Sequence, residues 1–191
     1  MSSNPTDNAH ALSHADRTSI DERVTDRLPG DIEMTEAERV ERQRNVATVG
    51  RFLELLEAEQ IEAFLDLWAD DTRQDMPYAP PDFPGTLHGK ARIAEQYRAL
   101  PATYDYMRYS DRELFATHDA RVVIARFRGD IKLKGKDVKY DNRYLNVFVF
   151  DADGRIVRNI EHFNPLVLMA GGAFGDGGHP TGGKGETENG R

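Results

Sequence analysis

Residues 138–165, VKYDNRYLNVFVFDADGRIVRNIEHFNP, decide the fold of this chain. They predict two strands, residues 138–150 and 155–163, joined by a turn at residues 151–154, because aspartate and glycine suit a tight turn. Side chains alternate between the two faces of a strand. One face of this hairpin therefore carries tyrosine, asparagine and phenylalanine, while the other is almost entirely aliphatic.

Glu161 is the first candidate for a reacting group. A four-residue turn would pair Glu161 with Tyr144 and Asn159 with Asn146, so that the carboxylate lies among amides and aromatic rings. Burying a carboxylate in such a place is costly unless it is paired or protonated. The hairpin therefore predicts a polar-studded pocket in which Glu161 transfers protons. An exposed glutamate at the edge of a twisted sheet is the alternative that this pattern leaves open.

The rest of the chain predicts helices followed by strands. Thr35 and Glu38 form a capping-box pattern, which predicts a helix running to about residue 58. Helical spacing of apolar residues continues in residues 60–69 and 90–100, and strand patterns cover residues 73–78, 104–115 and 121–133. This order predicts an α+β fold in which a curved antiparallel sheet wraps around three N-terminal helices. The folded domain should span residues 35–170, between a disordered arm (1–34) and a flexible glycine-rich tail (171–191).

Composition excludes several classes of function. The chain has 191 residues, a net charge of −8 and no cysteine. The acidic balance argues against a nucleic-acid groove, and the lack of cysteine excludes thiolate chemistry. No apolar run is long enough for a membrane span and no signal segment is present, which favours a cytoplasmic protein. Metal-ligand spacings and nucleotide-binding glycine motifs are also missing, so we expect no metal and no cofactor.

Two parts of the sequence resemble a known family. They are WADDTRQDMPYAPP (68–81) with HGKARIAEQY (88–97), and the stretch from YDNRYLNVFVF to EHFNP (140–165). Together they are similar to the SnoaL-like branch of the nuclear-transport-factor-2-like superfamily, over about residues 35–165. The resemblance implies a cone-shaped barrel, a small-molecule pocket and a homodimer formed through the sheet. The aliphatic face of the hairpin would supply the dimer contact, through Leu145, Val147, Val149, Ile156 and Ile160.

Within that superfamily, phenazine-biosynthesis condensing proteins are most similar to the second stretch. Their acid/base glutamate corresponds to Glu161, whereas Gln96 stands where they have a catalytic histidine. Limonene-epoxide-hydrolase-type enzymes offer a second match, in which their Arg-x-Asp corresponds to Arg128 and Asp130, with Glu161 as the later carboxylate. Ketosteroid isomerases fit worst, because Met76 stands at the position of their base.

The epoxide-hydrolase match implies a second group of site residues. Facing inward, Arg128 would hold Asp130 ionised while Glu161 kept a proton to donate. The alternation of charged residues would equally suit a solvated outer face, and the family spacing favours the pocket.

The pocket as a whole should also contain residues that contact the substrate. They are Trp68, Asp75, Met76, Tyr78, Gln96, Tyr97, Tyr144, Asn146 and Phe163.

These observations predict a cofactor-independent acid/base enzyme that acts on a small organic molecule. The expected step is a condensation, cyclisation or isomerisation in specialised metabolism. Epoxide hydrolysis is the alternative within enzymes, and a dimer that binds a small ligand without turnover is the alternative outside them.

Overall fold

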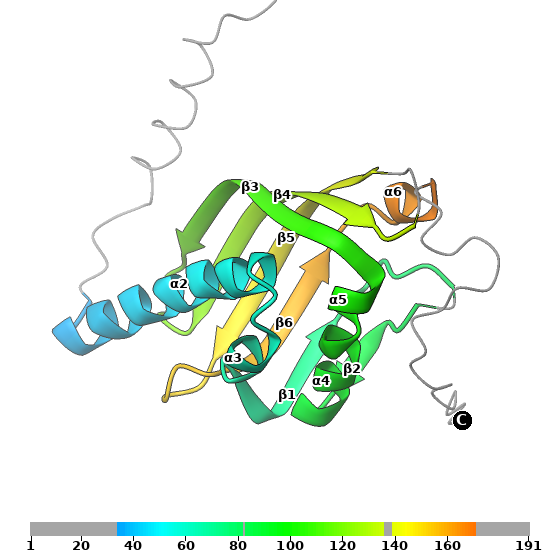
Figure 1. The fold of residues 1–191 in the computed structure, drawn as a ribbon. Coiled ribbons are helices and arrows are strands. Elements are labelled where there is room, and N and C mark those ends of the chain that lie inside the picture. Colours follow the sequence, from blue (N-terminus) through cyan, green and yellow to red (C-terminus); the bar gives the residue numbers. More distant parts are fainter. Residues whose placement is uncertain (1–33, 82, 136–138, 171–191) are drawn as a thin grey trace, which may run out of the picture. The chain divides into compact units, whose positions relative to one another are not determined.

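The computed structural model describes residues 34–170 except 82 and 136–138, with all its elements in the unit Thr35–Arg191 (Figure 1). The predicted N-terminal arm and C-terminal tail lie outside the described residues. Helix α2 (Glu36–Glu57) begins at the predicted capping box. The backbone amide of Glu38 donates to the Thr35 hydroxyl over 3.2 Å, and the Thr35 amide donates to the Glu38 carboxylate over 2.8 Å. These two bonds satisfy amides that a helix start leaves unpaired.

The other helices are shorter than the sequence predicts. Helix α3 (Ile61–Leu65) ends before Trp68, and α4 (Lys90–Arg98) is followed by a separate turn of helix, α5 (Leu100–Thr103). The predicted helix over residues 60–69 is wrong in its second half. Trp68 keeps the helical spacing, but it begins strand β1 (Trp68–Asp75) and pairs with Ile156. The strand predicted at residues 73–78 therefore starts earlier and ends at Asp75.

Six strands form one sheet in the order β2-β1-β6-β5-β4-β3. The remaining strands are β2 (Thr86–His88), β3 (Tyr104–Ala116), β4 (Val122–Leu133), β5 (Lys139–Phe150) and β6 (Ile156–His162). The pairing is antiparallel throughout, except that β1 runs parallel to β6. The α+β prediction is confirmed, with one parallel pair added to the predicted antiparallel sheet.

The register of the β5–β6 hairpin differs from the predicted one by two residues. Glu161 pairs with Asn146, and Asn159 pairs with Phe148. The turn is longer than predicted, because β6 begins at Ile156, and an irregularity between Val149 and Phe150 shifts the pairing further. A shift of two residues keeps each side chain on its face. Glu161 therefore stays on the inward face although its partner changes.

The same irregularity corrects one predicted dimer residue. Ile156 pairs with Phe150, is fully buried and belongs to the core. It cannot contribute to an outer face. Leu145, Val147, Val149 and Ile160 remain on the other side of the sheet, where Leu145 is 42% exposed.

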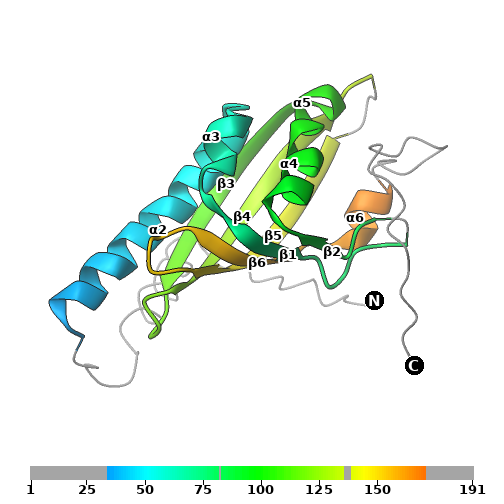
Figure 2. The ribbon, with the colours of Figure 1, turned by 90° about the horizontal axis from the view of Figure 1, so that it is seen from below.

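Helices α2 to α5 cover one face of the sheet, as Figures 1 and 2 show. The core lies between these two layers, where the rings of Phe52, Phe64, Trp68 and Phe148 contact one another. The short helix α6 (Pro165–Ala170) follows β6 and packs against β5. Among the described residues, no helix is long and apolar enough to cross a membrane.

Candidate active site

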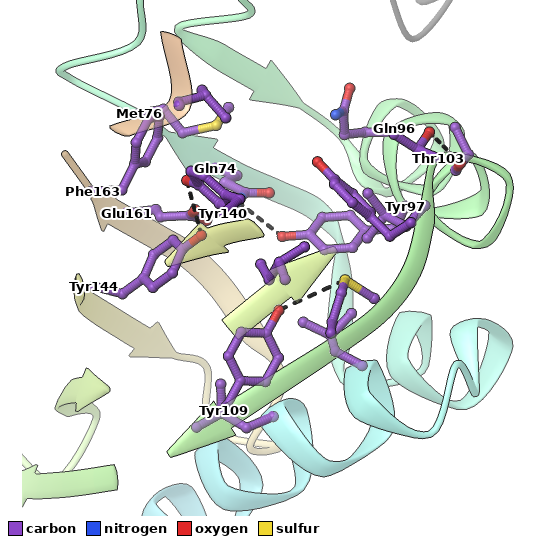
Figure 3. Close-up of a pocket in the computed structure, with 18 of the residues that line it drawn as sticks. Gln74, Met76, Gln96, Tyr97, Thr103, Tyr109, Tyr140, Tyr144, Glu161 and Phe163 are labelled. Carbon is purple, nitrogen blue, oxygen red and sulfur yellow. Dashed lines mark hydrogen bonds between the residues drawn. The ribbon is translucent and has the colours of Figure 1, made fainter. Parts of the chain in front are cut away.

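A cavity of about 330 Å³ lies between the sheet and its helices (Figure 3). Its walls are mostly apolar and aromatic, and they come from nearly every element. The helices α2, α4, α5 and α6 contribute Phe52, Leu53, Leu56, Gln96, Tyr97, Leu100, Thr103 and Leu168. The strands contribute Gln74, Leu87, Tyr104, Met107, Tyr109, Phe127, Ile131, Tyr140, Tyr144, Asn146 and Glu161.

Glu161 is the carboxylate that faces this cavity. The side-chain amide nitrogen of Gln74 donates a hydrogen bond of 2.8 Å to its Oε2. Burial among aromatic rings raises the pKa of Glu161 to about 7, and the hydrogen bond from Gln74 opposes that shift. Desolvation disfavours the charged form of an acid, whereas a donor stabilises it. Glu161 can therefore exist in both protonation states near neutral pH.

Five tyrosines surround this carboxylate: Tyr97, Tyr104, Tyr109, Tyr140 and Tyr144. Burial raises the pKa of each hydroxyl, and the negative charge of Glu161 adds to the shift; for Tyr104 the result is about 12. All five are therefore neutral phenols that can donate hydrogen bonds. The amide of Gln74 also donates to the Tyr97 hydroxyl, over 3.0 Å, so Gln74 bridges a phenol and the carboxylate.

Six of the nine predicted substrate contacts line the cavity: Met76, Gln96, Tyr97, Tyr144, Asn146 and Phe163. Three do not. Trp68 is fully buried within the aromatic core, and Tyr78 is 61% exposed beside His162. Asp75 points to the outer face, because it alternates with the inward Gln74 along β1.

The surroundings of Asp75 suit an ion-pair anchor. Burial alone would raise its pKa, but hydrogen bonds from Arg73, Arg158 and Thr86 outweigh burial and lower the pKa below its usual value. The carboxylate is thus held ionised by partners on β1, β2 and β6. It cannot serve as a substrate contact from there.

Arg128 and Asp130 are not part of the cavity, so the predicted pair of carboxylates bridged by one guanidinium is wrong. On β4 the inward residues are Phe127, Gly129 and Ile131, and the alternating charged residues face outward. Arg128 pairs instead with Asp141 on β5, with Nε at 2.8 Å from Oδ1, and its side chain is 46% exposed. Asp130 accepts a hydrogen bond of 3.4 Å from the hydroxyl of Tyr106.

Sequence reasoning missed several polar members of the site, among them Gln74, Tyr104, Tyr109 and Tyr140. Gln74 had a readable signal, because Asp71, Arg73 and Asp75 are charged whereas Thr72 and Gln74 between them are neutral. That alternation marks the inward face of β1. Tyr140 shares the inward face with Tyr144 and Asn146, and it follows from the same parity.

The arrangement supports proton transfer. A carboxyl group that ionises near pH 7 can act both as acid and as base, and neutral phenols beside it can bind an oxygen that gains negative charge. Within the described residues, no group of three or more histidine, aspartate or glutamate side chains could hold a metal ion.

Comparisons with known proteins agree with this fold. YesE, an uncharacterised protein of Bacillus subtilis, is 28% identical over 129 residues, covering 66% of this chain and 87% of its own. A phenazine biosynthesis-related protein of Pseudomonas aeruginosa has a similar structure, with a TM-score of 0.62, 22% identity, and coverage of 71% of this chain and 89% of its own. An epoxide hydrolase of M. tuberculosis, similar to limonene epoxide hydrolase, gives a TM-score of 0.54 at 19% identity, over 68% of this chain and 89% of its own.

A match to a protein-family model covers most of the described residues. The SnoaL-like domain model covers residues 49–159, from the buried half of α2 to the middle of β6. Proteins with this nuclear-transport-factor-2-like fold bind small-molecule ligands and often form dimers. Because the match spans more than half of the sequence, the chain belongs to the SnoaL-like domain family.

Proposed function

We propose that this protein is an enzyme that catalyses proton transfer on a small, largely apolar organic molecule, with Glu161 as the acid/base group and without a cofactor. The observation that carries the proposal is the position of Glu161, whose carboxylate lines the aromatic cavity and accepts a hydrogen bond from Gln74. Burial at this position raises its pKa to about 7. A general acid/base works best when its pKa lies near the working pH.

The cavity limits the substrate to a compact molecule. Its volume of about 330 Å³ is at the lower end of the range for ligand pockets, roughly 300–1,000 Å³. Aromatic side chains such as Phe127, Tyr144 and Phe163 form much of the wall, and the Phe127 and Tyr144 rings are stacked 5.0 Å apart. The best substrates for this cavity are therefore flat, unsaturated molecules that enter it without a charge.

Condensation, cyclisation and isomerisation share the step that this site supports. In each, a base removes a proton next to a carbonyl group and the same group returns it elsewhere. Epoxide hydrolysis of the limonene type is disfavoured, because Arg128 and Asp130 lie on the outer face. Among the described residues, Glu161 is the only carboxylate that lines the cavity.

Hydrogen–deuterium exchange tests the proposal without knowledge of the natural substrate. The probe is 2-tetralone, an aromatic ketone whose α-protons exchange with D₂O and can be followed by NMR. Wild-type protein should accelerate the exchange, with a rate that rises with pH and levels off above about 7, as Glu161 ionises. Glu161→Gln should slow the catalysed exchange by roughly two to four orders of magnitude.

Glu62→Gln is the matched control, because Glu62 is an exposed glutamate paired with Arg98 on the helices. It should exchange 2-tetralone at the wild-type rate. Equal rates for Glu161→Gln and wild type would contradict the proposal. A ketone that raises the melting temperature of the wild type but exchanges no faster than in buffer would favour a ligand-binding protein instead.

We also propose that the protein is a homodimer formed through the outer face of the sheet. Phe115, Ile124, Val147 and Ile160 are cross-strand neighbours in register, and they form one apolar row across β3, β4, β5 and β6. Phe115 is 40% exposed and the adjacent Leu145 is 42% exposed. An apolar row of this kind is typical of a self-complementary interface.

A further inference from the structure

The side chain of Asn142 makes four hydrogen bonds inside the protein, and they fix which way its amide points. Oδ1 accepts from the backbone amide of Arg143 at 2.8 Å and from that of Asn164 at 3.0 Å. Nδ2 donates to the Asn164 carbonyl at 2.9 Å and to the Tyr140 hydroxyl at 2.8 Å. Backbone amides can only donate, so they must face the oxygen. The nitrogen therefore faces Tyr140.

This orientation determines the role of the Tyr140 hydroxyl. An amide nitrogen cannot accept a hydrogen bond, so the oxygen of Tyr140 is the acceptor from Asn142. The Tyr144 hydroxyl lies 3.1 Å away and donates to the same oxygen. A phenol oxygen accepts two hydrogen bonds and has one proton of its own. With both acceptor positions filled, the proton of Tyr140 is directed away from Asn142 and Tyr144.

The cavity is the space into which that proton can point. Tyr140 is 4% exposed and lines the cavity together with Tyr144 and Glu161 (Figure 3). Hydrogen bonds donated to the oxygen by Tyr144 and Asn142 act to lower the pKa of Tyr140, against the larger effect of burial. Such bonds polarise the O–H group and make it a stronger donor.

We propose that Tyr140 binds a negatively charged ligand oxygen, such as that of an enolate or a phenolate, and that Asn142 is the residue that positions its hydroxyl. The proposal deepens the proposed function, because removal of a proton next to a carbonyl group places negative charge on an oxygen. Glu161 would hold the proton while Tyr140 holds the oxygen.

Asn142 also connects this hydroxyl to the end of the domain. Asn164, whose backbone it binds through both donor and acceptor, precedes α6, and the Asn164 side chain accepts from the Leu166 amide at 3.0 Å. Leu168 on α6 is 5% exposed and lines the cavity. The side-chain amide of Asn142 thus contacts both the Tyr140 hydroxyl and the segment that leads into α6. Loss of Asn142 should therefore disturb the hydroxyl and the helix together.

The probe for the test is 4-nitrophenol, whose phenolate absorbs visible light, so absorbance reports the ionisation of the bound ring. 4-Nitroanisole has the same ring without an ionisable proton, and it reports whether the cavity still accepts the ring. Measurements in the Glu161→Gln background as well as in the wild type keep the charge of Glu161 from repelling the phenolate.

Tyr140→Phe should shift the ionisation of bound 4-nitrophenol against the phenolate by roughly tenfold or more, the usual size for loss of a hydrogen bond to a charged group. Tyr144→Phe and Asn142→Leu should shift it in the same direction by about threefold or more, because each removes one donor to Tyr140. Tyr106→Phe is the control, since Tyr106 bonds Asp130 on the outer face, and it should shift the ionisation less than twofold. Binding of 4-nitroanisole should be retained in every variant.

Hydrogen exchange of the backbone amides of residues 164 and 166–170 tests the connection to α6. Asn142→Leu should accelerate it by roughly tenfold or more, whereas Tyr140→Phe should leave it unchanged. Asn142→Leu with wild-type exchange in this segment would overturn the coupling. Phenolate binding that Tyr140→Phe does not change would overturn the role of Tyr140, and so would failure of the wild type to bind either probe. Loss of 2-tetralone exchange in Glu161→Gln would still support the proposed function, so the two failures are distinguishable.

Discussion

Gln74 and Glu161 are joined by a hydrogen bond of 2.8 Å between β1 and β6. The bond runs from a neutral donor to a carboxyl group whose ionisation is disfavoured by burial. The strength of this hydrogen bond therefore determines how far burial can raise the pKa of Glu161. Gln74 is 2% exposed, and it lines the cavity together with Glu161.

Removing that donor should raise the pKa of Glu161 further. In Gln74→Met the side chain keeps its length but loses the donor, so burial acts on the carboxyl group unopposed. We expect the pKa to rise above its value of about 7 by roughly one to two units, since a hydrogen bond to a charged group is worth about 1.5–3 kcal/mol. Infrared titration of the carboxyl group measures the shift. Gln96→Met is the control, because Gln96 lines the cavity from α4, and it should leave the pKa within a few tenths of a unit.

Glu161 should make the protein less stable as the pH rises. Its pKa is about 7 in the folded protein, above the ordinary value of 4.5 that applies when the chain is unfolded. The folded state therefore binds the proton more tightly, which stabilises it below about pH 4.5, and this stabilisation is lost as the pH rises through about 7. The full difference amounts to about 3 kcal/mol.

Glu161→Gln has no proton to lose at this position. Chemical denaturation should find it more stable than the wild type at pH 8 by about 1–3 kcal/mol and close to the wild type at pH 4. A variant that is less stable than the wild type at pH 8 would contradict the burial of the charge. If Glu161→Gln gains stability and also loses the exchange of 2-tetralone, it shows the pattern expected of a residue in a functional site.

The alternation of side chains along the strands explains which site residues could be predicted from the sequence. The inward positions of Tyr144, Asn146 and Glu161 follow from alternation in β5 and β6, and they survive an error of two residues in the register. Alternation alone could not say which face of β4 was inward. The inward position predicted for Arg128 and Asp130 is wrong, because the apolar Phe127 and Ile131 beside them point inward.

Other features depended on contacts that no local pattern shows. The inward turn of Ile156 results from the irregular pairing beside Val149, and the strand role of Trp68 results from its parallel pairing with β6. The bridge from Gln74 to Tyr97 and Glu161 joins three elements far apart in the sequence. Such contacts follow from the packing of the whole domain.

Arg128→Ala should leave the cavity unaffected. Arg128 is exposed on the outer face and pairs with Asp141, and exposed ion pairs contribute roughly 0–1 kcal/mol. We expect the exchange of 2-tetralone to stay within twofold of the wild-type rate. A loss of tenfold or more, with unchanged stability, would return Arg128 to the reacting site and favour the epoxide-hydrolase alternative.

Val147→Arg should separate the proposed dimer. Val147 lies in the apolar row between Ile124 and Ile160, so a guanidinium group there would lose water on association without gaining a partner. Size-exclusion chromatography with light scattering should give a dimer for the wild type and a monomer for the variant. Lys132→Arg is the control, since it keeps the charge of a partly exposed residue near the end of β4. A wild type that is monomeric at tens of micromolar would contradict this interface.

Gly129 leaves room for the aromatic wall of the cavity. A Cβ atom at this position would lie 2.9 Å from Cε2 of Tyr144 and 3.5 Å from Cε1 of Tyr109, the first being closer than real Cβ contacts allow. Glycine within a strand often marks such a close approach. Because the Tyr144 ring is stacked on Phe127, it cannot move away from the new methyl group without disturbing a second ring.

Gly129→Ala should therefore displace Tyr144 and lengthen its 3.1 Å hydrogen bond to Tyr140. We expect a loss of about 1–3 kcal/mol in the free energy of unfolding, the usual cost of overpacking a core. The exchange of 2-tetralone should fall as well, because the hydroxyl of Tyr144 no longer supports Tyr140. Gly85→Ala is the matched control, since nothing lies within 4 Å of a Cβ atom there, and it should change neither quantity. If Gly129→Ala keeps the stability and the exchange rate of the wild type, the Tyr144 ring can move without cost. That result would contradict the rigid stacking of Tyr144 on Phe127.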